Sequence, residues 1–318
     1  MLDSTDVKRW LLLVGLVGLV GCGDNEPSVP TPSELAHGVV AIAGDDDGLF
    51  YTSVAAGMDV LSRREWTSGR TFALESFGLP IESGQMWLAV AGGTVVWGRR
   101  EAFATSARYR VRSTNDADVS RIIPVPDLRP LYITPGTTAR LSYYDLVSPD
   151  LPLRELDLAT FVVEGDCPTR GDPIVGVTVD SGTAWVTAES PAGRYLATFE
   201  ARRPRSFLPV QALAGPAVIA GDERFVLATD LDGEVFIQRG EELWPLGTRK
   251  ISNGVWFENA LWVSDLEAQE LVRVRLDGTT ERFATSRPYA TLDVIAGRLI
   301  VGVDEPDHRR TVYEQPLP

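Results

Sequence analysis

The stretch GVWFENALWVSD, from Gly254 to Asp265, followed by ELVRVRLDGTTERFA from Glu270 to Ala284, contains the pattern that decides the fold. Its first part is a short apolar strand, a tight turn, and a second strand rich in aromatic and β-branched residues. The second part adds two strands joined at Asp277-Gly278, a dipeptide preferred in tight hairpin turns. The stretch is therefore expected to form four antiparallel strands.

The same unit recurs along the chain at a regular spacing. Its turns fall near residues 46, 92, 136, 181, 222, 258 and 297, about 36 to 46 residues apart, close to the spacing of about 40 to 50 residues typical of four-stranded propeller blades. No stretch of ten or more residues shows apolar positions at helical spacing. The copies begin at Val39, Trp87, Leu131, Ile174, Ala217, Gly254 and Leu292.

The expected fold class is therefore all-β: a β-propeller of seven blades, or of six or eight if one repeat is misassigned. Ring closure is the open question, because propellers usually complete one blade with strands from both ends of the chain. The last repeat ends after a third strand at residues 311–315, and nothing before Val39 has the pattern of a good strand. Either the last blade has three strands, or residues 33–37 contribute a poor fourth.

The segment Leu261–Asp265, with the third strand that runs into Leu276-Asp277-Gly278, resembles the YWTD-type and NHL-type propellers, which include streptogramin-lyase-like proteins. Those families have an aromatic-rich second strand ending in Thr/Ser-Asp and a third strand that runs into Leu-Asp-Gly. Residues 49–53 and 226–230 resemble the same pattern. The resemblance covers much of residues 37–318 and implies a propeller fold, whereas its motifs specify a blade and not an activity.

The N-terminus has the features of a bacterial lipoprotein signal. Lys8 and Arg9 precede an uncharged apolar run, Trp10–Gly21, which is about 18 Å long as a helix and too short for a hydrocarbon core of about 30 Å. The run ends Leu-Val-Gly-Cys, which is similar to a lipobox and implies that Cys22 is lipidated. An ordinary secretory signal with an incidental cysteine is the alternative.

Three regions follow from this interpretation: a signal peptide at 1–21, a lipidated cysteine with a disordered tether at 22–36, and one propeller domain at 37–318. The tether is rich in Gly, Pro, Ser and acidic residues, a composition that cannot bury a core. We expect a cell-envelope protein anchored by its lipid. Gly23 after the cysteine favours the outer membrane, facing the periplasm or the cell surface.

Composition narrows the possible partners. The formal net charge is −14, so the protein is expected to repel nucleic acid and anionic headgroups. The expected partners are an envelope protein, a peptide or a glycan. Cys167, the only cysteine besides Cys22, is interpreted as an incidental free thiol in a loop.

Known catalytic and metal patterns are missing from the sequence. With His37 and His308 as the only histidines, no dense His/Cys metal cluster forms, and neither accompanies a nucleophile motif. There is no phosphate-binding glycine motif, so no metal and no cofactor is expected. The acidic segments 45–48 and 230–234 offer calcium-type ligands, but hairpin turns explain them better.

The candidate binding site lies where the innermost strand of each blade begins, because these strands surround the central channel. Aligning the repeats on their first turn places His37, Gln85, Arg129, Asp172, Gly215, Asn253 and Tyr289 in one column. The corresponding segment supplies the axial pocket in NHL-like propellers, so the resemblance implies that four of these residues contact a ligand: Arg129, Asp172, Asn253 and Tyr289. The alternative is that they are ordinary polar loop residues.

These observations favour a binding or scaffold module that presents a propeller face to a partner. The alternative is a propeller enzyme, a lyase or hydrolase that uses a metal held by acids, with its site at the channel mouth. Trp97, Trp185 and Trp262 occupy equivalent positions on second strands, and we expect them to fill the space between blades rather than to stack on a ligand.

Overall fold

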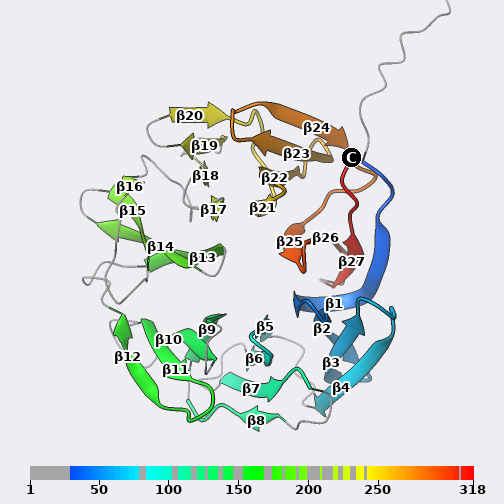
Figure 1. The fold of residues 1–318 in the computed structure, drawn as a ribbon, viewed down its shortest axis with the longest axis vertical. Helices are drawn as coiled ribbons and strands as arrows, with labels where there is room; N and C mark the ends of the chain where they lie inside the picture. Colours follow the sequence, from blue (N-terminus) through cyan, green and yellow to red (C-terminus); the bar gives the residue numbers. More distant parts are fainter. Residues whose placement is uncertain are drawn as a thin grey trace, which may run out of the picture.

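The described strands form a ring of antiparallel sheets, and no described residue is helical. Figure 1 shows β1, β5, β9, β13, β17, β21 and β25 around the centre of the ring. The all-β propeller expected from the repeats is confirmed. The computed structural model describes residues 29–78, 84–101, 107–115, 120–125, 128–134, 139–145, 153–167, 174–180, 183–190, 193–198, 208–209, 218–220, 225–229, 234–239, 242–307 and 309–318.

Five of the sheets have four strands in sequence order, and each is one blade built from a continuous stretch of chain. Blade 2 contains β5 (Gly84–Ala91), β6 (Thr94–Glu101), β7 (Ala107–Ser113) and β8 (Arg121–Ile122). Blade 3 contains β9 (Leu128–Thr134), β10 (Arg140–Asp145), β11 (Leu153–Asp157) and β12 (Val163–Cys167). Blade 4 contains β13 (Ile174–Asp180), β14 (Thr183–Ser190), β15 (Gly193–Thr198) and β16 (Leu208–Pro209).

Blades 5 and 6 have the same construction. Blade 5 contains β17 (Val218–Ala220), β18 (Phe225–Thr229), β19 (Val235–Arg239) and β20 (Glu242–Pro245). Blade 6 contains β21 (Val255–Phe257), β22 (Ala260–Asp265), β23 (Glu270–Arg275) and β24 (Thr280–Ala284). The stretch from Gly254 to Ala284 thus forms one complete blade.

The sixth sheet has seven strands, and it closes the ring through a shared strand, β1 (Ser33–Asp45). The first half of β1 pairs with the last strand of the chain, and its second half pairs with β2. Blade 1 therefore comprises the second half of β1 with β2 (Gly48–Ala55), β3 (Met58–Glu65) and β4 (Thr71–Gly78). Blade 7 comprises β25 (Thr291–Ile295), β26 (Arg298–Asp304), β27 (Arg310–Glu314) and the first half of β1.

Of the two closures left open by the sequence, the structure has the one in which the N-terminal segment supplies the fourth strand. The strand begins at Ser33, four residues before the expected domain boundary, so the expected disordered tether is too long at this end. Before the strand, the Gln315 side-chain amide donates a hydrogen bond of 2.9 Å to the carbonyl oxygen of Pro30. Weak strand propensity in residues 33–37 is overridden by the free edge of β27.

Strand register distinguishes the two faces of the ring. In blade 7, Thr291 pairs with Gly302 at one end of β25, and Ile295 pairs with Arg298 at the other. We call the face where the inner strands begin the start face and the opposite face the end face. Ser33, at the beginning of β1, pairs with Glu314, which in turn pairs with Ile300. The N-terminal strand therefore begins on the side of the end face.

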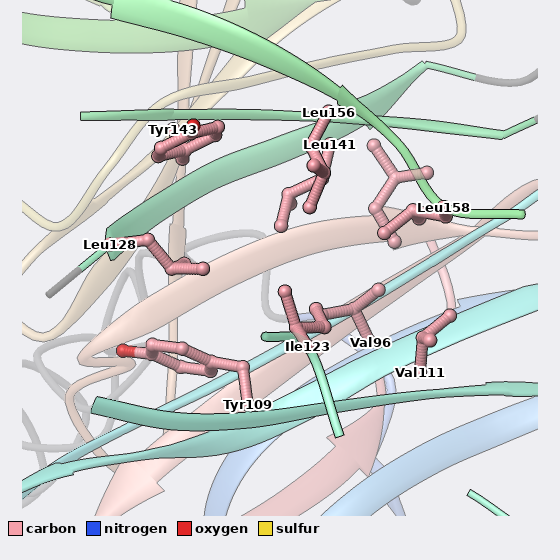
Figure 2. Close-up of a cluster of buried hydrophobic side chains, with 10 residues drawn as sticks. Val96, Tyr109, Val111, Ile123, Leu128, Leu141, Tyr143, Leu156 and Leu158 are labelled. Carbon is pink, nitrogen blue, oxygen red and sulfur yellow. The ribbon is translucent and has the colours of Figure 1, made fainter. Parts of the chain in front are cut away.

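Apolar side chains fill the space between neighbouring blades. Figure 2 shows the cluster between blades 2 and 3, where Tyr109, Val111 and Val96 face Leu128, Leu141 and Leu156 across the gap. Trp97 and Trp262 are fully buried in the corresponding positions, which confirms their expected packing role. Trp185 lies in β14, where only the backbone is described.

Within the residues that the structure describes, no helix is long and apolar enough to cross a membrane.

Candidate functional site

The start face contains the features that bear on binding, because two kinds of connection meet there. One is the link that leads into each inner strand. The other is the turn between the second and third strands of a blade, such as residues 266–269 after Asp265 in blade 6 and residues 305–309 in blade 7. Residues far apart in the sequence, such as His37 and Arg309, therefore lie on the same face.

Asn253 lies in the link before β21, as expected, but its side chain joins two blades. Its amide nitrogen donates to the carbonyl oxygen of Leu292 at 2.6 Å, and its amide oxygen accepts from the Leu292 backbone N–H at 2.8 Å. This paired contact has the form of a β-bridge between the link into blade 6 and the inner strand of blade 7. Asn253 therefore joins two blades while the residue stays exposed, and its expected contact with a ligand stays a prediction.

Tyr289 lies in the link before β25 and is only 1% exposed. Its hydroxyl donates to Gln315 Oε1 at 2.6 Å, and the same glutamine holds Pro30. Burial raises the pKa of Tyr289 to about 12, so the phenol is neutral at physiological pH. The ring packs inward against blades 6 and 7, and the expected contact of Tyr289 with a ligand stays a prediction.

The other expected site residues lie near the end of a described segment or outside the described residues. Arg129 belongs to β9, where its backbone pairs with Tyr144. Asp172 and the lipidation candidate Cys22 lie outside the described residues. Cys167 was expected in a loop, but it is the last residue of β12 and pairs with Leu153. Edge pairing of this strand with β11 explains the difference.

The acidic turns behave as hairpin turns where they are described. Asp45 Oδ1 accepts hydrogen bonds from the backbone N–H groups of Asp47 and Gly48, at 3.1 and 3.2 Å. This contact is typical of an Asp that closes its own turn. Among the described residues no group of three His, Cys, Asp or Glu side chains is placed to hold a metal ion. The segment 230–233 lies outside the described residues.

Sequence reasoning missed a hollow of about 240 Å³ on the start face. It lies where β1 passes from blade 7 to blade 1, opposite the turn between β26 and β27. Gly38 has a φ of +66°, a backbone conformation that favours glycine and turns the strand toward the ring centre at this point. We call this cavity the seam hollow, and its lining residues are His37, Gly38, Glu305, Pro306, Asp307 and Arg309.

A hydrogen-bonded series of three side chains lies beside the seam hollow. The Thr311 hydroxyl is 2.9 Å from His37 Nδ1 and donates to Glu305 Oε1 at 2.8 Å. A carboxylate can only accept, and a hydroxyl has one hydrogen, so His37 Nδ1 must be the donor to Thr311. The tautomer with its hydrogen on Nδ1 has its acceptor lone pair on Nε2. Thr311 itself is only 2% exposed, which fixes the series in place.

A carboxyl on the inner strand of blade 7 is a separate feature. Burial raises the pKa of Asp293 above its ordinary value, while a 2.7 Å hydrogen bond from the Val294 backbone N–H partly offsets this. Carboxyls with perturbed pKa values are candidates for function on physical grounds. Asp293 was not recognised from the sequence. In the sequence alone, an acidic residue within an apolar strand looks the same as one in a turn.

The ring of antiparallel blades defines the chain as a β-propeller, and the solved structures similar to it are propellers. Streptogramin B lyase has a TM-score of 0.56 with it at 16% identity, over 92% of this chain and 97% of that one. A catalytically inactive variant of virginiamycin B lyase from Staphylococcus aureus, with quinupristin, has a TM-score of 0.59 at 13% identity, over 90% and 99%. BamB from Moraxella catarrhalis has 0.53 at 17% identity, over 87% and 85%. At these identities the likeness shows the fold alone.

Sequence comparisons are less informative. No family profile matches the chain. A segment of 125 residues is 29% identical to an anthranilate phosphoribosyltransferase from Myxococcus xanthus. The match spans 39% of this chain and 37% of that enzyme, so the chain covers well under half of that relative.

Proposed function

We propose that this protein is a lipid-anchored propeller of the bacterial cell envelope that binds an envelope protein, a peptide or a glycan through its start face. The observation that carries the proposal is the path of the N-terminal strand, which begins on the side of the end face. An anchor at Cys22 would then attach to the side of the ring opposite the seam hollow. BamB from Moraxella catarrhalis has the same fold, and this likeness is consistent with the proposal.

Chain length restricts how far the ring can move from the membrane. Val29 packs against the apolar cluster between blades 6 and 7, and Pro30 is held by Gln315. The segment between Cys22 and Val29 reaches at most about 25 Å when fully extended. The start face would therefore point away from the lipid surface, where a partner can reach it. We assign the protein to the outer membrane because Gly23 follows the candidate lipidated cysteine.

Lipidation is tested by metabolic labelling with an alkynyl fatty acid, followed by membrane fractionation. Cys22→Ala should lose the label and move to the soluble fraction. Cys167→Ala is the matched control, because it removes the only other thiol, and it should keep both label and membrane association. Label that persists in Cys22→Ala would overturn the anchor.

Partner binding is tested by placing a photo-crosslinking amino acid on each face in turn. Ala268 is exposed in the start-face turn of blade 6, and Asp46 is exposed in the end-face turn of blade 1. We expect a specific crosslinked partner from position 268 and none from position 46. Arg129→Ala and Asp172→Ala, each combined with the crosslinker at 268, then test whether these candidate residues contribute. The opposite pattern of crosslinks would place binding on the end face.

A propeller enzyme with its site at the channel mouth is the second candidate, and Asp293 is the observation that favours it. Burial raises the pKa of Asp293 above its ordinary value, and a carboxyl with a raised pKa is a candidate general acid. The names of the two lyases suggest a first substrate to try. Incubation with quinupristin, followed by chromatography, should show loss of substrate with the wild type and not with Asp293→Asn if this candidate is correct.

A further inference from the structure

We infer that the seam hollow is a binding site for one basic side chain, a guanidinium or an ammonium group, presented by the partner. The inference rests on the proposed function for the existence of that partner. The site itself is defined by the structure alone.

The size of the hollow restricts what it can hold. Pockets for drug-sized ligands have volumes of about 300 to 1,000 Å³, whereas the seam hollow has about 240 Å³. It therefore suits a single long side chain rather than a whole small molecule. Its lining is polar apart from Gly38 and Pro306, so an apolar side chain gains little there.

Glu305 is the group that gives the hollow its preference for a cation. Three other acids of blade 7 each have an arginine: Asp304 with Arg310 at 2.7 Å, Asp307 with Arg309 at 3.1 Å, and Glu314 with Arg298 at 2.7 Å. Within the described part of the chain, Glu305 has no basic partner, and its carboxylate accepts from the neutral Thr311 hydroxyl. Because Glu305 is half-buried, this uncompensated charge is costly, and a cation from a partner would offset the cost.

The neighbouring groups add acceptors with suitable geometry. The Nδ1–H of His37 is used by Thr311, which leaves Nε2 as an acceptor beside the hollow. The Asp307 carboxylate is 55% exposed and contributes negative charge, although Arg309 partly balances it. A guanidinium has five N–H donors and no acceptor, so the acceptors of Glu305 and His37 match it. The net charge of −14 also attracts a basic partner over longer distances.

The probe for this site is tri-arginine, and tri-citrulline is its uncharged isostere. Binding to the purified propeller is measured by titration calorimetry at low ionic strength. We expect tri-arginine to bind and tri-citrulline to bind at least about fivefold more weakly, the ratio for roughly 1 kcal/mol at a partly exposed ion pair. Equal affinities would overturn the inference.

The matched variants are Glu305→Gln and Asp304→Asn. Each removes one negative charge, and the two residues are adjacent, but Asp304 does not line the hollow. Glu305→Gln should weaken tri-arginine binding about fivefold, and Asp304→Asn less than about twofold. Equal losses would show a general charge effect in place of a site. Circular dichroism and the thermal midpoint establish that both variants remain folded.

The same variants separate this inference from the proposed function. If the wild type and Glu305→Gln crosslink the same partner from position 268 with equal yield, the seam hollow does not bind the partner, and the proposed function stands. If tri-arginine binds as expected but no envelope partner is crosslinked, the proposed function fails, and the cation site stands.

Discussion

The joint between blades 6 and 7 and the joint between blades 7 and 1 solve the same packing problem in different ways. Between blades 6 and 7, large rings fill the gap: Trp262 and Tyr289 are buried, and Trp262 stacks on Phe283 with ring centroids 6.1 Å apart. Between blades 7 and 1, the fully buried side chains are aliphatic, such as Val39, Ile295 and Val312, and the rings of Tyr51 and Trp66 are only partly buried against them. Ile295 packs directly over Gly44.

The difference follows from how the two joints are connected. Blade 6 is a continuous segment, so its contact with blade 7 depends on side chains and on the Asn253 bridge to Leu292. Blades 7 and 1 share one strand, so backbone hydrogen bonds hold them together and less apolar volume is needed. The shared strand must change direction at Gly38, and this change leaves the seam hollow beside it.

Removing the shared strand should have the largest effect. Deletion of residues 29–38 leaves the edge of β27 without its partner and exposes Val312 and Tyr313. Because β-propellers depend on ring closure, we expect the loss of a cooperative unfolding transition, measured by thermal circular dichroism and hydrogen exchange. Deletion of residues 23–28, which precede the described contacts, is the control and should leave the transition unchanged.

Truncation of Trp262 should have the next largest effect. The side chain is fully buried, and its indole N–H donates to the carbonyl oxygen of Phe257 at 3.1 Å. Trp262→Ala is expected to lower the free energy of unfolding by about 3 to 5 kcal/mol, measured by urea denaturation. Trp66→Ala, at the other joint, should cost less, because Trp66 is only partly buried. Equal losses would show that the two joints do not differ in this way.

Repeat spacing was sufficient to predict the class of fold, because each blade repeats the same strand and turn chemistry. It could not decide ring closure, because Ser33–Ala36 has little strand propensity and pairs only where β27 offers a free edge. The alignment correctly placed Asn253 and Tyr289 in links before inner strands. It could not show that both side chains make contacts within the protein. A polar loop residue looks the same in the sequence whether its side chain contacts a ligand or another part of the protein.

The seam hollow was beyond sequence reasoning for a related reason. His37 and Glu305 are 268 positions apart, and no local motif connects them. The available signal was the rare histidine next to a glycine at the start of the first repeat. Only the strand register, which brings β1 beside β27, places these residues together.

Loss of the Asn253 bridge should have an intermediate effect. Asn253→Ala removes both hydrogen bonds to Leu292 at once and leaves two backbone groups to find other partners. We expect a loss of about 1 to 3 kcal/mol in the free energy of unfolding, with hydrogen exchange faster at the amide of Leu292 than elsewhere in blade 7. Glu267→Ala, in an exposed turn of the same blade as Asn253, is the control. Unchanged exchange at Leu292 would contradict the bridge.

Acid pH should have the smallest effect of these changes. It should lower the stability of blade 6 through protonation of Asp265. Burial would raise the pKa of this carboxyl, but hydrogen bonds from the backbone N–H groups of Ala268 and Glu267 and from Arg282 hold its pKa below 3.8. The folded-state pKa therefore lies below the unfolded one. The stabilisation is fully present above the unfolded pKa and is lost as the pH falls through the folded one.

Asp265→Asn should therefore be less stable than the wild type at pH 7, by about 1 kcal/mol, and the difference should narrow below pH 3.8, the ordinary pKa of the carboxyl. Thermal midpoints measured across this range for both proteins test the sign. Glu267→Gln, an exposed neighbour in the same turn, should show no such convergence. A difference that is constant with pH would mean that the hydrogen bonds of Asp265 hold the turn without depending on its charge.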